Sequence, residues 1–194
     1  MKYLLTALFP FLLYQPKSTP TPLAVNVFWT NDTGMDADNI IYYHAESPLE
    51  WPDFKGAPGP SSPIAAITTS GFGYKADMKT LNGKGQINIG VYCFFNKDRS
   101  WVRPGRTTDY ILTHEQHHFD ASYLAANLFM QRVRNTSMSA SDCNTILPQL
   151  YRECCDTMNK LQNDYDGQTH NGQLDDVQEK WNDYFVAKLR GITG

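Results

Sequence analysis

The distribution of apolar and polar positions changes once along the chain. Its first half carries three short segments rich in β-branched and aromatic residues and separated by Gly, Pro, Asn and Asp, at 24–30, 63–74 and 85–95. From there on, apolar residues recur at helical spacing over three longer segments, at 107–134, 145–164 and 173–190. The pattern predicts an α+β fold in which a small antiparallel sheet from the N-terminal half packs on three C-terminal helices.

The second and third predicted helices each carry one apolar stripe. In the second helix the stripe consists of Leu147, Leu150, Cys154, Met158, Leu161 and Tyr165. In the third it consists of Leu174, Val177, Trp181, Phe185 and Leu189. Residues three and four apart share a helix face, so these stripes are expected to form the core of the helical half.

The N-terminus differs from the rest of the chain. Residues 1–16 combine one Lys with an apolar run that is too short for a membrane span, which is typical of a signal peptide or an N-terminal anchor. Residues 17–23 are rich in Pro and Thr and are expected to be a tether. Residues 24–194 then form a single domain, and the protein is expected to be exported to the periplasm or the extracellular space, remaining anchored if the N-terminal segment is uncleaved.

Composition narrows the class of protein. With 41 % hydrophobic and 19 % charged residues the chain is globular, and its net charge of −3 offers no basic surface, so nucleic acid is not an expected partner. No stable membrane span is expected in the mature chain. The chain has four cysteines, which suit an oxidising compartment: Cys93, Cys143, Cys154 and Cys155. They are expected to form one or two disulfides or to be buried thiols, and the sequence does not select a pairing.

The segment His114-Glu115-Gln116-His117-His118 spells HExxH inside the first predicted helix. Four residues make about one helical turn, so His114 and His118 are expected to hold one metal ion from a shared face. Glu115 lies beside this pair and can take a proton from water as a general base. His117 points about 100° away from His118, and we expect it on the surface or behind the ligands rather than as a ligand.

A third protein ligand is required, and the sequence leaves several candidates open. The motif that continues HExxHxxGxxH is excluded, because Ala121 and Leu124 occupy its Gly and His positions. His170, in the turn expected after the second helix, is the first choice. The alternatives are Asp166, Asn171 and a later Glu, with Glu153 and Glu179 as candidates.

The motif and its surroundings resemble a bacterial family, domain of unknown function 922, described as secreted zinc-dependent proteases. The resemblance is carried by Leu112 to Asp120, by Tyr165-Asp166 with Thr169, and by Gln178 with Trp181-Asn182. It extends into the first half, through Trp51 to Gly56, Ala65-Ala66, Thr68 to Ser70 and Ser100-Trp101, and so covers nearly the whole exported chain. One position departs from the family, which has a His where this chain has Asn171.

Motif and resemblance together lead to one functional expectation. The chain is expected to be a zinc metallopeptidase with one Zn²⁺ held by His114, His118 and His170, Glu115 as the general base, and a peptide or other amide as substrate. Tyr165 is the candidate donor to the developing oxyanion. The alternative is a catalytically silent module on the same scaffold that binds a metal or a protein. A structural zinc would instead require four protein ligands.

Overall fold

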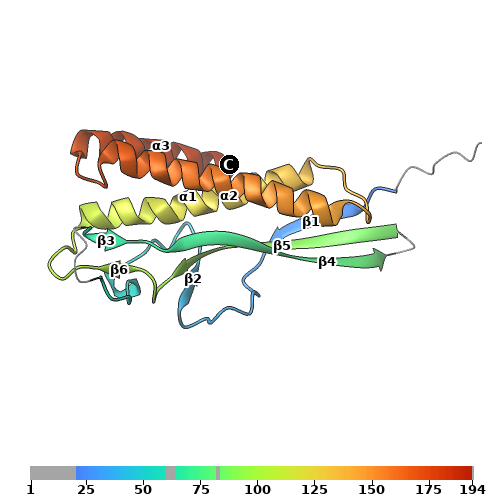
Figure 1. Cartoon of the computed structure of the whole chain (residues 1–194), viewed down its shortest axis with the longest axis horizontal. Helices are drawn as coiled ribbons and strands as arrows, with labels where there is room; N and C mark the ends of the chain where they lie inside the picture. Colours follow the sequence, from blue (N-terminus) through green and yellow to red (C-terminus); the bar gives the residue numbers. More distant parts are fainter. Residues whose placement is uncertain (1–20, 60–63, 82–83, 194) are drawn as a thin grey trace, which may run out of the picture.

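The computed structural model describes residues 21–59, 64–81 and 84–193. In chain order its elements are β1 (Ala24–Trp29), β2 (Ile40–Tyr42), a 3-10 turn η1 (Trp51–Asp53), β3 (Ala66–Ile67), β4 (Ser70–Leu81), β5 (Lys84–Asn96), β6 (Trp101–Val102), α1 (Asp109–Arg134), α2 (Cys143–Thr169) and α3 (Asp175–Thr193). Figure 1 shows α1 lying along one face of the sheet, with α2 and α3 on the other side of α1. The predicted α+β fold, with strands first and three helices last, is confirmed.

Strand β5 organises the sheet. It pairs along nearly its whole length with β4, antiparallel, while its other edge carries β2 antiparallel and β1 parallel. The sheet is therefore mixed, and the prediction of an antiparallel sheet was wrong for β1. The long connection between β1 and β5 allows the chain to return to the end of the sheet from which it started, which a hairpin cannot do.

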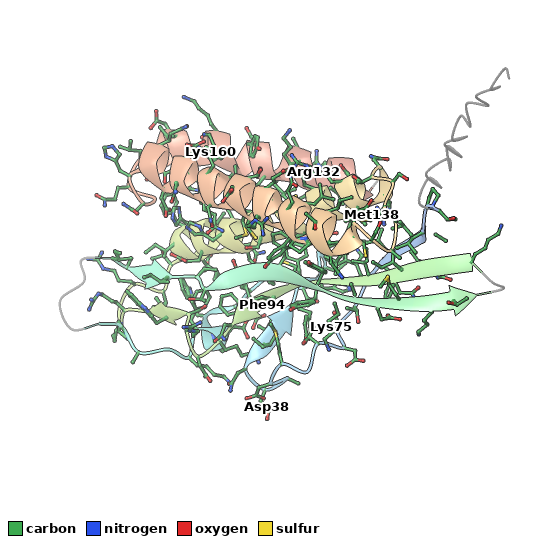
Figure 2. The ribbon with its side chains drawn as sticks, turned by 45° about the vertical axis from the view of Figure 1, so that its right-hand side comes forward. Asp38, Lys75, Phe94, Arg132, Met138 and Lys160 are labelled. Atoms are coloured by element: carbon green, nitrogen blue, oxygen red, sulfur yellow. The ribbon has the colours of Figure 1, made fainter. Side chains whose placement is uncertain are left out.

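The helix-facing side of β5 explains why this segment is a strand. Its apolar side chains alternate and are at most 2 % exposed: Ile87, Ile89, Val91, Cys93 and Phe95. Phe94 has the opposite parity and lies on the far face of the sheet (Figure 2). The inward residues pack against Phe119, Ala126 and Phe129 of α1 in the main core.

Helix α1 is covered on two sides, by the sheet and by the α2–α3 pair. A second apolar cluster, formed by Ala121, Tyr165 and Phe185, lies between the three helices. Side chains pointing in several directions from the middle of α1 are consequently buried, including His114, Glu115, His117 and His118. A helix enclosed in this way has no wide polar face, so its polar residues must find partners inside the protein.

Helix α2 is longer than the sequence pattern indicated. It continues to Thr169 with Pro148 inside it, so Asp166 is a helical residue rather than part of a loop. The four cysteines are free thiols, with Cys93, Cys143 and Cys154 buried. In the described ranges, no helix combines the length and the apolar character that crossing a bilayer requires.

The predicted leader, residues 1–16, lies outside the described residues, as does most of the predicted tether. The last residues of that tether are part of the fold. Pro22 forms an isolated bridge with Ser139, and the backbone N–H of Leu23 donates to the carbonyl oxygen of Met138 at 2.7 Å.

Candidate metal centre

The candidate site is centred on two imidazoles of α1. The helix begins after Thr108, whose side-chain oxygen accepts a hydrogen bond from the backbone N–H of Ile111 at 3.2 Å. His114 and His118 then lie one turn apart, with ring centroids separated by 5.1 Å and residue exposures of 5 % and 8 %. The prediction that these histidines share one helix face is confirmed.

Asp166 of α2 brings a third donor to this pair. Its Oδ1 lies 3.1 Å from Nε2 of His114 and 3.1 Å from Nε2 of His118, and the ligand atoms of the three residues all lie within 4.8 Å of one another. Burial alone would raise the pKa of the Asp166 carboxyl, but the hydrogen bonds and charges of the two histidines outweigh it and hold the pKa well below its usual range. The site therefore presents an ionised oxygen between two ring nitrogens.

His170 is not part of this group in the structure. It caps the C-terminus of α2 in the left-handed conformation, with φ 50°, and its side chain is exposed. Because α2 continues past Asp166, that residue lies on the helix face toward α1 while His170 lies beyond the last turn. Among the other candidates, Asn171 lines the pocket beside the site, Glu153 pairs with Arg132 at 2.7 Å, and Glu179 is exposed on α3.

Amide side chains hold the other nitrogen of each imidazole. Nδ1 of His114 lies 2.9 Å from Oε1 of Gln178, and Nδ1 of His118 lies 3.1 Å from Oε1 of Gln162. When each ring keeps its proton on Nδ1, the lone pair of each Nε2 is available to a metal ion that takes the place of the hydrogen bonds to Asp166. Sequence reasoning did not single out Gln162; its spacing of one helical turn before Asp166 is the signal that could have done so.

Glu115 is buried beside the histidines, with a residue exposure of 4 %. Its Oε2 has no hydrogen-bond partner among the described residues, although the atom is fully enclosed. Burial raises the pKa of the Glu115 carboxyl, opposed by the charges of His118 and His114 and by a hydrogen bond from Thr68. A carboxylate with a raised pKa and an oxygen that lacks a hydrogen-bond partner is suited to accept and return a proton.

A pocket of about 810 Å³ opens onto the site. Its walls come from three places: the strand region at 64–68, the first half of α1, and the end of α2 with the turn that follows it. His114, Glu115, His118 and Asp166 all line it. A substrate of substantial size can therefore reach the site, although most of each metal-binding side chain is enclosed by protein.

Two tyrosines lie near the site, one buried behind His114 and one in the wall of the pocket. Tyr165 was the candidate oxyanion donor, but it is fully buried, stacks on the ring of His114 with centroids 4.6 Å apart, and does not line the pocket. Tyr110 does line the pocket, and burial together with a hydrogen bond to Asp175 raises its pKa. Tyr165 is therefore a support for the His114 ring.

His117 is a buried residue that lies behind the ligands. Its Nδ1 lies 2.8 Å from Oδ2 of Asp120, its Nε2 lies 3.0 Å from Oδ1 of Asn182, and its ring stacks on Phe185. The expectation that His117 is not itself a ligand agrees with this position. Of the alternatives given for it, the surface is excluded, because α3 covers this side of α1.

Gly172 lies against the His114 ring, where a side chain would be crowded. It has φ +73°, and a Cβ added there would lie 3.1 Å from Nδ1 of His114. We expect Gly172→Ala to lose about 2 kcal/mol of stability through backbone strain and to weaken metal binding by displacing the His114 ring. Thermal unfolding with and without zinc measures both effects. Gly167→Ala is the matched control, because Gly167 is helical with open space around it, and it should be neutral or slightly stabilising.

The donor set fits a divalent metal ion. Two imidazoles and one carboxylate are ligands that zinc takes in hydrolytic sites, and imidazole suits other transition metals as well. The described residues group three such donors, so a tetrahedral ion held by them would keep one further position. The chain matches no known protein family model, no curated protein and no solved structure.

Proposed function

We propose that this protein is an exported zinc metallopeptidase in which His114, His118 and Asp166 hold the ion and Glu115 is the general base. The observation that carries the proposal is the enclosed Oε2 of Glu115, which has no partner among the described residues, next to three converging donors. A buried polar atom without a partner costs free energy, so its retention calls for a functional reason. A site that only stored or structurally bound a metal has no need of it.

The residues of the chain divide the chemistry between them. Zinc, when bound, would polarise the carbonyl of the substrate and activate a water. Glu115 takes the proton of that water and passes it to the nitrogen of the leaving amine. Gln178 and Gln162 fix the imidazoles through Nδ1, and the strand region at 64–68 supplies the wall against which an extended substrate can lie.

The proposal also includes membership in domain of unknown function 922 and export through the N-terminal segment. What supports the family is that residues carrying the resemblance lie together in space: Asp166 and Gln178 both contact His114, and Asn182 contacts Gln178. The departure at Asn171 places a pocket-lining amide where the family has His. Asp166 then takes the ligand role that His170 was expected to have.

The first test is metal content and turnover on the same sample. The full chain, purified and loaded with zinc, should bind one ion per chain and hydrolyse a mixed peptide library, and chelation should abolish the activity reversibly. Zinc at one ion per chain without hydrolysis of any peptide or amide would favour the alternative, a catalytically silent binding module. Absence of bound zinc would remove the basis of the proposal.

Arg106 is expected to influence which peptides bind. It is exposed, and it is the one Lys or Arg among the described residues that line the pocket. The walls of the pocket also include the apolar residues Ile64, Ile67 and Ile111. We expect Arg106→Ala to raise KM about five-fold for substrates whose carboxylate lies beside Arg106 and to leave kcat unchanged. A roughly five-fold change in KM corresponds to the loss of one exposed ion pair. Kinetics on matched acidic and amide peptides measure this, and an equal change for both would contradict it.

A further inference from the structure

A chain of polar side chains leads from the metal site through α3 to a buried carboxylate on α1. Nδ1 of His114 lies 2.9 Å from Oε1 of Gln178, and Nε2 of Gln178 lies 2.8 Å from Oδ1 of Asn182. Nε2 of His117 lies 3.0 Å from the same Oδ1, and Nδ1 of His117 lies 2.8 Å from Oδ2 of Asp120. Five residues are thus joined in series.

The members of this chain cannot rely on solvent. Gln178 is 1 % exposed, Asp120 3 % and His117 6 %, so each must satisfy its hydrogen bonds within the protein. Asp120 is held further by the hydroxyl of Tyr43 and the side-chain amide of Gln116, both donating to its Oδ1 at 2.9 Å. Its Oδ2 remains as the acceptor at the end of the series.

The donors and acceptors of the chain are coupled. A carboxamide has one accepting end and one donating end, so the direction of each link determines the next. If Nδ1 of His114 donates to the oxygen of Gln178, the Gln178 nitrogen must donate to Asn182. The oxygen of Asn182 is then also the acceptor that faces Nε2 of His117, whose Nδ1 lies beside the Asp120 carboxylate.

The opposite direction is also self-consistent, and it is incompatible with metal binding. With both amides reversed, Gln178 donates to Nδ1 of His114, which moves the ring proton to Nε2, the atom that must bind the ion. Asn182 then donates to both Gln178 and His117. The Tyr165 hydroxyl, which contacts the Gln178 amide, can serve as donor or acceptor and does not select a direction. The orientation of the Gln178 amide is therefore coupled to that of the Asn182 amide.

We propose that Asn182 is a positioning residue of the metal site, which it does not touch. It acts through Gln178: by accepting from the Gln178 nitrogen, it turns the Gln178 oxygen toward His114 and keeps Nε2 of His114 available to the ion. The proposal rests on the metal site of the proposed function but not on peptide hydrolysis. Its test therefore measures zinc affinity, which is unaffected if the natural reaction is a different one.

The test is a double-mutant cycle on the full chain, with zinc affinity measured by competition against a chelator. Asn182→Leu should weaken zinc binding ten-fold or more, within the range of about 10- to 100-fold for groups behind a ligand. In a Gln178→Glu background the same substitution should change affinity less than about two-fold, because a carboxylate accepts at either oxygen and needs no orienting partner. Asn182→Asp, which still accepts from both neighbours, should retain native affinity.

Each outcome of the cycle decides the question. A loss of equal size in both backgrounds, or no loss in either, would overturn the positioning role, as would failure of the native chain to bind zinc. Val133→Ala is the control for general destabilisation, because Val133 is fully buried in the core of α1 and belongs to no part of this series. It should lower the unfolding temperature without changing zinc affinity. A loss of zinc affinity in Asn182→Asp would also overturn the positioning role, because that side chain still accepts from both neighbours.

Discussion

Replacement of Glu115 by Gln is expected to lower kcat by about three orders of magnitude while zinc remains bound at native affinity. The side chain is not among the grouped metal donors, and the substitution preserves its shape. It removes the ability of the carboxylate to take a proton, and proton transfer by a positioned side chain accounts for about 10²- to 10⁴-fold in rate. The carboxylate, whose Oε2 lacks a hydrogen-bond partner among the described residues, is replaced by an amide of nearly the same volume.

Glu179→Gln provides the matched control for this experiment. Glu179 is exposed on α3 and does not line the pocket, so this substitution also removes one carboxylate but leaves the pocket unchanged. It should leave zinc content and kcat at native values. If Glu115→Gln retained most of its activity, Glu115 would not be the base and the mechanism proposed here would fail. Loss of zinc in Glu115→Gln would instead show that the carboxylate is needed to assemble the site.

The histidine pair could be predicted because it depends on local geometry alone. A helix places residues four apart on one face whatever surrounds it, and His114 and His118 needed only the helix that the apolar pattern around them indicated. The same holds for the division of the chain into a strand half and a helical half. These features follow from spacing within about one turn or one strand.

The third donor could not be selected in that way. Its identity depends on where α2 ends, and the apolar stripe of that helix fades near Tyr165 although the helix continues to Thr169. Four further residues of helix place Asp166 on the face toward α1 and move His170 to the cap. Helix ends are set by capping and tertiary contacts rather than by the stripe, so the sequence left Asp166 and His170 as alternatives.

The position of His117 and the direction of β1 depend on contacts between distant segments. His117 is enclosed because α3 packs on α1, where Phe185 stacks on its ring. β1 runs parallel to β5 because the chain between them returns across the whole sheet. No local pattern encodes either contact, and β1 by itself has the same alternation that an antiparallel strand would have.

Removal of the Asp166 carboxylate is expected to cause the largest loss of metal affinity of any change outside the histidine pair. Zinc sites with four ligands bind with roughly 10–16 kcal/mol, so the loss of one ligand corresponds to about 3 kcal/mol, or more than a hundred-fold in Kd. Asp166→Ala should therefore bind zinc at least a hundred-fold more weakly. It should also no longer gain thermal stability when zinc is added.

His170→Ala is the variant that makes this result specific. His170 is exposed at the C-cap and stands apart from the grouped donors, so its replacement should change zinc affinity by less than about two-fold. Competition against a chelator on the two variants and the native chain gives the comparison directly. Loss of zinc in His170→Ala with retention in Asp166→Ala would mean that the turn after α2 closes over the ion when it binds. That outcome would reverse the assignment, because a histidine in the left-handed cap would have to leave that conformation to reach His114 and His118.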